Sequence, residues 1–90
     1  MKYFEWNEVK NKQLMQKRNI SFEIVVVCIK NGYILDKIKY PNYKKYPHQF
    51  VYIIEIDEYV YAIPFVEDNE KIFLKTIIPS RKLTRQYLNK

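Results

Sequence analysis

Three cations lie close together near the C-terminal end of the chain, at Arg81, Lys82 and Arg85. An apolar stretch ends at Pro79 just before them, and Ser80 is of a type that commonly caps the start of a helix. The cations would then lie in the first turns of that helix, where the helix dipole favours anions. Because backbone N–H groups and positive side chains would converge there, the pattern favours a bound anion. We expect that anion to be a phosphate of RNA.

Four other basic side chains could contribute to such a site. His48 is the single histidine; it could act as an acid or base near neutral pH, or be a structural or merely exposed residue. Lys75 lies in an otherwise apolar segment, where it either lines a site or faces solvent. Lys17 and Arg18 suit contact with an RNA backbone, or they form an ordinary solvated helix end. For Arg85, phosphate binding and a salt bridge to acidic turns are both open.

The net charge of +6 is unevenly distributed along the 90 residues. Six of the ten acidic residues fall between Glu55 and Glu70, a span without Lys or Arg, whereas basic residues gather at 10–18, 37–45 and 71–90. This segregation predicts a positive surface and an acidic one. The positive surface fits a nucleic acid or another polyanion. The alternative is a lysine-rich face that only keeps the protein in solution.

The composition argues against several other classes of site. A single cysteine, Cys28, excludes an intrachain disulfide and a cysteine-based zinc cluster, and we expect it to be a small buried residue. A single glycine leaves no Gly-rich phosphate loop, and no ligand spacing indicates a metal, so we expect neither metal nor cofactor. No apolar run approaches the roughly 18 residues of a membrane span, and the N-terminus does not read as a signal peptide. We therefore expect one cytoplasmic domain over residues 1–90, without membrane contact.

Helices are predicted where polar caps precede apolar residues. Asn7 can cap a helix at 8–18, and Ser21 can cap a second helix that ends near Gly32. The β-branched run at 24–29 could equally form a strand, but the signals at both of its ends favour a helix.

The rest of the chain predicts strands and a last helix, which makes the fold class α+β. Short connections force antiparallel pairing, so we expect a four-stranded antiparallel meander with Pro64 causing a bulge or a missing ladder bond. The predicted strands are 33–40, 49–56, 59–66 and 71–78, with a loop at 41–47 and a short helix from Ser80.

Three segments of the chain resemble motifs of the BrnT family of toxins, which have the RelE-like ribonuclease fold. The segment 4–8, Phe-Glu-Trp-Asn-Glu, is similar to the family's start F-E-W-D-x-x-K. The segment 17–23, Lys-Arg-Asn-Ile-Ser-Phe-Glu, resembles K-H-G-V-S-F-E, and the segment 77–85 resembles the ending I-I-S-A-R-K-A-T-R. With the strands between these segments, the resemblance covers nearly the whole chain.

The chain also departs from these motifs. Arg18 takes the place of a histidine, Asn19 that of a glycine, and Thr76 that of the arginine that usually precedes the last motif. Pro79 and Ser80 replace serine and alanine. These departures fit a divergent branch with a rearranged site, and they also fit a member that has lost catalysis. A non-catalytic RNA- or protein-binding module on the same fold is therefore the alternative function.

The resemblance implies a metal-independent endoribonuclease that cleaves mRNA and inhibits translation. Such cleavage requires activation of the 2′-OH, stabilisation of charge on the phosphorane, and protonation of the leaving 5′-oxygen. The candidate catalytic residues are Arg81, Lys75 and His48, and the candidate RNA-binding residues are Lys17, Arg18, Lys82 and Arg85. The implied partner is a cognate antitoxin, such as a ribbon-helix-helix DNA-binding protein, in a complex that can be a heterotetramer.

Overall fold

The three helices begin at the residues that the sequence marks as caps. The computed structural model describes residues 2–42 and 44–89, and its helices are α1 (Glu8–Arg18), α2 (Phe22–Lys30) and α3 (Arg81–Leu88). The side chain of Asn7 accepts a hydrogen bond from the backbone N of Lys10 at 3.0 Å. Ser21 and Ser80 accept equivalent bonds at 3.3 and 3.1 Å. The predicted start of each helix is therefore confirmed.

The end of α2 explains the position of the single glycine. Tyr33 N donates to Cys28 O at 2.8 Å and Gly32 N donates to Ile29 O at 3.2 Å, which is the bonding pattern of a Schellman motif. That motif requires a left-handed residue, and Gly32 has a φ of +76°. The β-branched run before it is therefore helical, as the capping signals predict.

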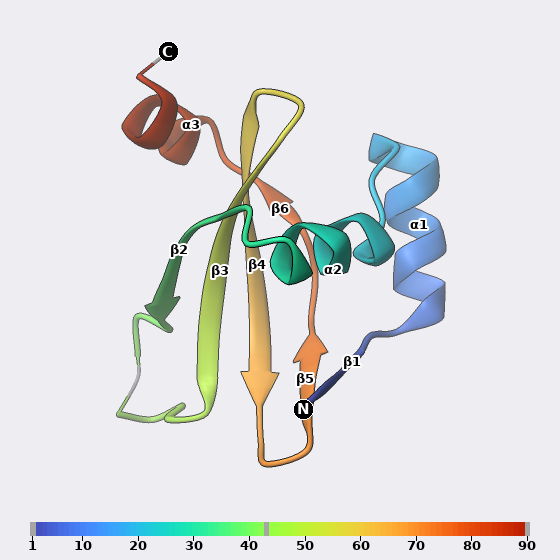
Figure 1. The fold of residues 1–90 in the computed structure, drawn as a ribbon, viewed down its shortest axis with the longest axis vertical. Helices are drawn as coiled ribbons and strands as arrows, with labels where there is room; N and C mark the ends of the chain where they lie inside the picture. Colours follow the sequence, from blue (N-terminus) through green and yellow to red (C-terminus); the bar gives the residue numbers. More distant parts are fainter. Residues whose placement is uncertain (1, 43, 90) are drawn as a thin grey trace.

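The sheet is mixed, and the prediction of four antiparallel strands is wrong. Figure 1 shows β1 beside β5 at one edge of the sheet, and the two strands run parallel. The strand order is β1-β5-β4-β3-β2, with β6 pairing with β4 beyond the end of β5. The strands are β1 (Tyr3–Glu5), β2 (Ile34–Lys39), β3 (Gln49–Ile56), β4 (Tyr59–Glu67), β5 (Lys71–Leu74) and β6 (Ile78–Pro79).

The predicted strand at 71–78 is divided into β5 and β6, and Pro64 gives the reason. The carbonyl of Pro64 accepts a hydrogen bond from Lys75 N at 2.8 Å, so it points toward the β5–β6 side of β4. The N–H and C=O of one strand residue point to the same side, so the N–H that proline lacks falls on that side as well. Pro64 therefore leaves the expected gap in the ladder on this side of β4. The strand next to it is interrupted at that point, between β5 and β6.

The β3–β4 hairpin is continuous past Pro64, from Gln49 opposite Val66 to Ile56 opposite Tyr59. Its two-residue turn is Asp57-Glu58, as predicted, and both residues have positive φ angles, of 52° and 62°. Positive φ at both positions is the geometry of the type I′ turn that matches the twist of a hairpin. The loop predicted at 41–47 lies between β2 and β3, as expected. Its residue 43 lies outside the described residues.

Helices cover both faces of the sheet. Phe22 and Val25 of α2 pack against Ile54, Ile63 and other buried side chains on one face. On the opposite face, Leu83, Tyr87 and Leu88 of α3 pack against Val51, Ile53 and Val60. Cys28 is half-buried rather than fully buried, and burial raises the pKa of its thiol. No helix among the described residues is long and apolar enough to cross a membrane.

Candidate nucleic-acid interface

The cations of α3 lie on its solvent-facing side. Leu83 and Tyr87 are partly buried against the sheet, and Thr84 is buried. Arg81, Lys82 and Arg85 are exposed. Positions i and i+4 share one side of a helix, so the two arginines form a pair on the surface with the lysine beside them. The predicted arrangement of these three side chains is therefore present.

Thr84, which the sequence motifs give no role, fixes the start of α3 on the sheet. Its hydroxyl accepts a hydrogen bond from Val60 N at 2.9 Å and donates one to Ser80 O at 2.7 Å. Ser80 N in turn donates to Val60 O at 3.0 Å. The threonine side chain thus satisfies a backbone N–H of β4 directly after β6 ends. The signal in the sequence is a polar residue on the otherwise apolar side of a short helix.

The last turn of α3 is held by β2. The hydroxyl of Tyr87 donates to Oδ2 of Asp36 at 2.9 Å. This bond to a carboxylate, together with some loss of hydration, raises the pKa of Tyr87. Two hydrogen-bonded contacts, one at each end, therefore set the orientation of the cationic side of α3.

Five cations on the helices are predicted to bind RNA or its phosphates. None of them has an acidic partner among residues 2–42 and 44–89. These five are Lys17, Arg18, Arg81, Lys82 and Arg85. Three other lysines are paired, Lys2 and Lys37 with Glu67 and Lys71 with Glu5 at 3.1 Å, whereas Lys10, Lys12 and Lys30 form no ion pair in the described part of the chain. Of the two alternatives for Arg85, the salt bridge to an acidic turn is not formed within the described part of the chain. The unpaired charges are available to an external anion.

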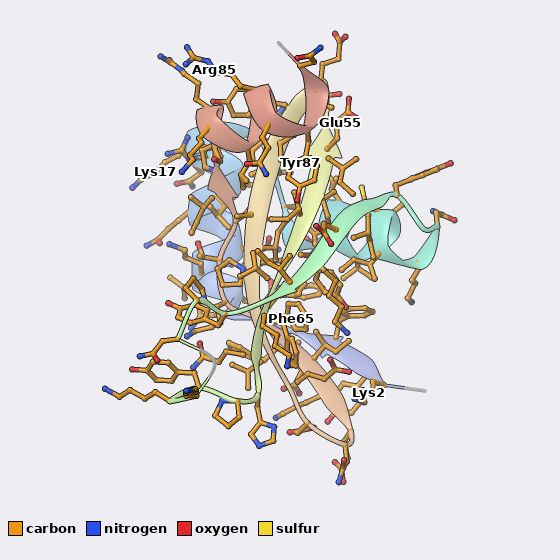
Figure 2. The ribbon with its side chains drawn as sticks, turned by 90° about the vertical axis from the view of Figure 1, so that its left-hand side faces the viewer. Lys2, Lys17, Glu55, Phe65, Arg85 and Tyr87 are labelled. Atoms are coloured by element: carbon orange, nitrogen blue, oxygen red, sulfur yellow. The ribbon has the colours of Figure 1, made fainter. Side chains whose placement is uncertain are left out.

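Lys17 and Arg18 form the last turn of α1, and both are exposed. In Figure 2, Lys17 and Arg85 point to the same side of the molecule, whereas Glu55 lies at the opposite end of α3. Figure 1 shows α1 and α3 on either side of β6. The two groups of cations therefore lie on either side of β6, on one surface of the molecule. We call this surface, with Lys17, Arg18, Arg81, Lys82 and Arg85, the basic face.

Lys75 lines a groove next to α1. It lies in the interruption between β5 and β6, is exposed, and its Nζ is 3.4 Å from Oε1 of Gln49. The groove has a volume of about 610 Å³ and is formed by the side chains of Asn7, Val9, Lys10, Gln13, Phe73 and Lys75. Lys75 is exposed and also lines this groove, so its position fits both alternatives, facing solvent and lining a site. Lys10, Gln13 and Gln49 were not among the predicted residues, because only the register of the strands brings them near Lys75.

His48 is not brought together with Arg81. It is exposed just before β3, in a pocket of about 340 Å³ that Lys2 and Glu67 also line. Arg81 follows β6, which pairs with Tyr61, and Tyr61 lies opposite Ile54. Six residues of strand separate His48 from Ile54, which is roughly 20 Å at about 3.3 Å per residue. One phosphate cannot be contacted by both side chains over that distance.

Glu67 is the centre of an ion network that the sequence motifs do not reveal. Its side chain is 18% exposed and binds Nζ of Lys2 and, at 3.4 Å, Nζ of Lys37. The bond from Lys2 is the main cause of the lowered pKa of Glu67, followed in the same direction by the charge of Lys37. Lys37 also lies 5.4–5.9 Å from the ring centres of Phe50, Tyr52 and Phe65. The network joins β2 and β4 to the residue before β1.

A family model described as a domain of unknown function (DUF4258) matches residues 12–79. The matched segment contains Lys17, Arg18, His48 and Lys75, and it ends before the cations of α3. Comparison with curated proteins gives no significant match, and comparison with solved structures gives none either.

Proposed function

We propose that this chain, which belongs to the family described as a domain of unknown function (DUF4258), is a metal-independent endoribonuclease toxin of a type II toxin–antitoxin pair. In this proposal it has a RelE-like fold, cleaves mRNA and thereby inhibits translation. The similarity of segments 4–8, 17–23 and 77–85 to the BrnT motifs supports the class of activity. The charge distribution on the surface supports the class of substrate.

The single observation that carries the proposal is the set of unpaired cations on the basic face. Five exposed positive side chains on α1 and α3 lack an acidic partner in the described chain. Grouped like charges repel one another, and a polyanion removes that repulsion while it releases its own counterions. An RNA strand, which carries one negative charge per nucleotide, is a natural partner for such a surface.

In this proposal each cation has a distinct role. Arg81 lies at the N-terminus of α3, where its planar guanidinium can bind two phosphate oxygens and stabilise the charge that develops on the phosphorane. Lys82, Arg85, Lys17 and Arg18 hold the phosphates on either side. Lys75 is the candidate for proton transfer, because it lines a groove next to α1, the helix that carries Lys17 and Arg18.

The second candidate function is a non-catalytic RNA- or protein-binding module. It is favoured by one observation, the separation of roughly 20 Å between His48 and Arg81 that follows from strand register. Without the histidine, the basic face provides charge stabilisation, and Lys75 is the one candidate left for proton transfer. A surface that binds RNA without cutting it requires no more than that.

A cognate antitoxin is the proposed protein partner. It would silence the toxin most directly by placing acidic and apolar side chains on the basic face, where phosphates would otherwise bind. A ribbon-helix-helix protein is one such partner, and the pair can assemble as a heterotetramer.

Induced expression in a bacterium, with growth and RNA integrity followed over time, tests the proposal. The toxin predicts growth arrest with loss of mRNA, and it predicts that Arg81→Ala relieves both. A matched control is Lys12→Ala, which removes another exposed helical cation outside the basic face. Growth arrest with intact RNA would favour the binding module, and no arrest in any variant would contradict the toxin.

A further inference from the structure

A groove on the side of the molecule opposite to the basic face has features that the proposed RNA activity does not use. It lies between β1 and α2, has a volume of about 900 Å³, and is lined mainly by apolar side chains. The residues around it are Lys2, Tyr3, Phe4, Trp6, Val26, Lys30 and Ile72. In Figure 2, Lys2 points to the side on which α2 lies, away from Lys17 and Arg85.

The groove contains an open sheet edge. β1 is the outermost strand, and β5 is its partner. Tyr3 N donates to Glu70 O at 3.2 Å, so the backbone groups of Tyr3 face the neighbouring strand. Successive residues of a strand direct their N–H and C=O groups to opposite sides, so those of Phe4 point outward. An open edge of this kind can accept another strand.

The described residues that line the groove carry only positive charge. Lys2 and Lys30 are the charged ones, and none of the described lining residues is acidic. Lys2 shares Glu67 with Lys37, so one carboxylate serves two lysines. On β1 itself, Glu5 is already paired with Lys71. The edge is therefore suited to a segment that brings its own carboxylates.

We propose that this groove binds an extended segment of another protein, which adds to the sheet as a strand beside β1 and carries both apolar and acidic side chains on the face of the sheet that α2 covers. Its apolar side chains would pack on Phe4 and Val26, and its carboxylates would meet Lys2 and Lys30. A second copy of the chain is a poor occupant, because a two-fold pairing of β1 strands would bring two sets of Lys2 and Lys30 together between molecules of charge +6.

The proposal does not depend on RNA binding, because the groove and the basic face lie on opposite sides. The probe is a short capped peptide in which every second residue is in turn valine and glutamate, so that both types lie on one face of the strand, with threonine at the positions between. It is added to the full chain and followed by amide NMR. We expect shifts confined to β1, α2 and β5, together with protection of the Phe4 amide from exchange. A lysine peptide of the same apolar pattern should not bind.

Backbone pairing is tested on the peptide, so that the fold of the protein is untouched. N-methylation at alternate positions on the edge that faces β1 should weaken binding at least about tenfold, because hydrogen bonds are lost. N-methylation at the other alternate positions should leave binding nearly unchanged. Equal effects of the two peptides would overturn strand addition.

Charge is tested on the protein. Lys30→Glu should weaken binding of the peptide about tenfold. Lys12→Glu reverses the charge of an exposed lysine on α1, away from the groove, and should leave the affinity for the peptide unchanged. RNA bound on the basic face should not be displaced by the peptide. No shifts at β1 and α2, displacement of RNA, or dimerisation of the free chain through β1 would each contradict the proposal.

Discussion

At the scale of single residues, Arg81 carries the largest share of the proposed chemistry. It is exposed at the first position of α3, and a guanidinium there can bind two phosphate oxygens at once. We expect Arg81→Ala to lower the rate of RNA cleavage by about 100- to 1000-fold, which is typical for loss of one charge-stabilising group.

Arg81→Lys should restore part of that rate, because a point charge cannot replace the planar fork. Cleavage of a labelled RNA by the purified variants measures both effects, and circular dichroism checks that they fold. Full activity in a folded Arg81→Ala variant would remove the arginine from the mechanism.

Glu67 makes a separate prediction, about stability. Its pKa is lowered in the folded chain, mainly by the bond from Lys2. A lowered pKa means that the carboxylate stabilises the fold above the ordinary glutamate pKa of about 4.3, and that this contribution is lost as the pH falls through the lowered value. Glu67→Gln should therefore reduce the unfolding free energy at neutral pH by about 2 kcal/mol and flatten its decline in acid.

Urea unfolding at a series of pH values measures this effect. Glu70→Gln is the matched control, because Glu70 is exposed in the β4–β5 turn and its side chain makes no hydrogen bond or ion pair in the described structure. If both variants lose stability equally and keep the same acid slope, the network around Glu67 does not stabilise the fold.

At the scale of elements, the attachment of α3 decides where the cations lie. Thr84→Val keeps the shape of the side chain but leaves Val60 N without its acceptor. An unsatisfied buried donor costs about 1–3 kcal/mol, so α3 should open locally and the Val60 amide should exchange faster. Thr84→Ser retains the hydroxyl and should behave nearly as the native chain does. Unchanged exchange in Thr84→Val would show that α3 is held by other contacts.

The elements also show what the sequence can and cannot predict. Local signals were sufficient for the helices, because a cap such as Asn7, Ser21 or Ser80 acts within one turn. β1 was missed because three residues are too few to show an alternating pattern. The interruption between β5 and β6 was missed because the effect of Pro64 falls on a strand that only the register brings beside it.

The features of the candidate site also divide into those set by local signals and those set by strand pairing. The exposure of Arg81, Lys82 and Arg85 follows from the apolar spacing of one helix, so the sequence predicts it. Two other features depend on how the strands pair, and the sequence cannot predict them. They are the contact of Lys75 with Gln49 and the distance between His48 and Arg81. The Glu67 network likewise requires β2, β4 and the N-terminal segment to meet.

At the scale of the whole molecule, the distribution of charge differs from the sequence prediction of one acidic surface. Asp57 and Glu58 form the turn before β4, whereas Asp68 and Glu70 follow its end. A strand of nine residues separates the two groups by roughly 30 Å at about 3.3 Å per residue. The acidic residues are therefore divided between the ends of the sheet, and the basic face lies between α1 and α3.

The salt dependence of RNA binding tests the central claim most directly. For a single strand, each phosphate contact contributes about 0.7 to the slope of log affinity against log salt. Replacing Arg81 and Arg85 with alanine should therefore reduce the slope by about 1.4, whereas replacing Lys12 and Lys30, which lie outside the basic face, should not change it. A fluorescent single-stranded RNA titrated across a series of salt concentrations measures this. The account predicts a steep slope that falls only in the arginine variant, and a slope that is flat or equally affected in both variants would contradict it.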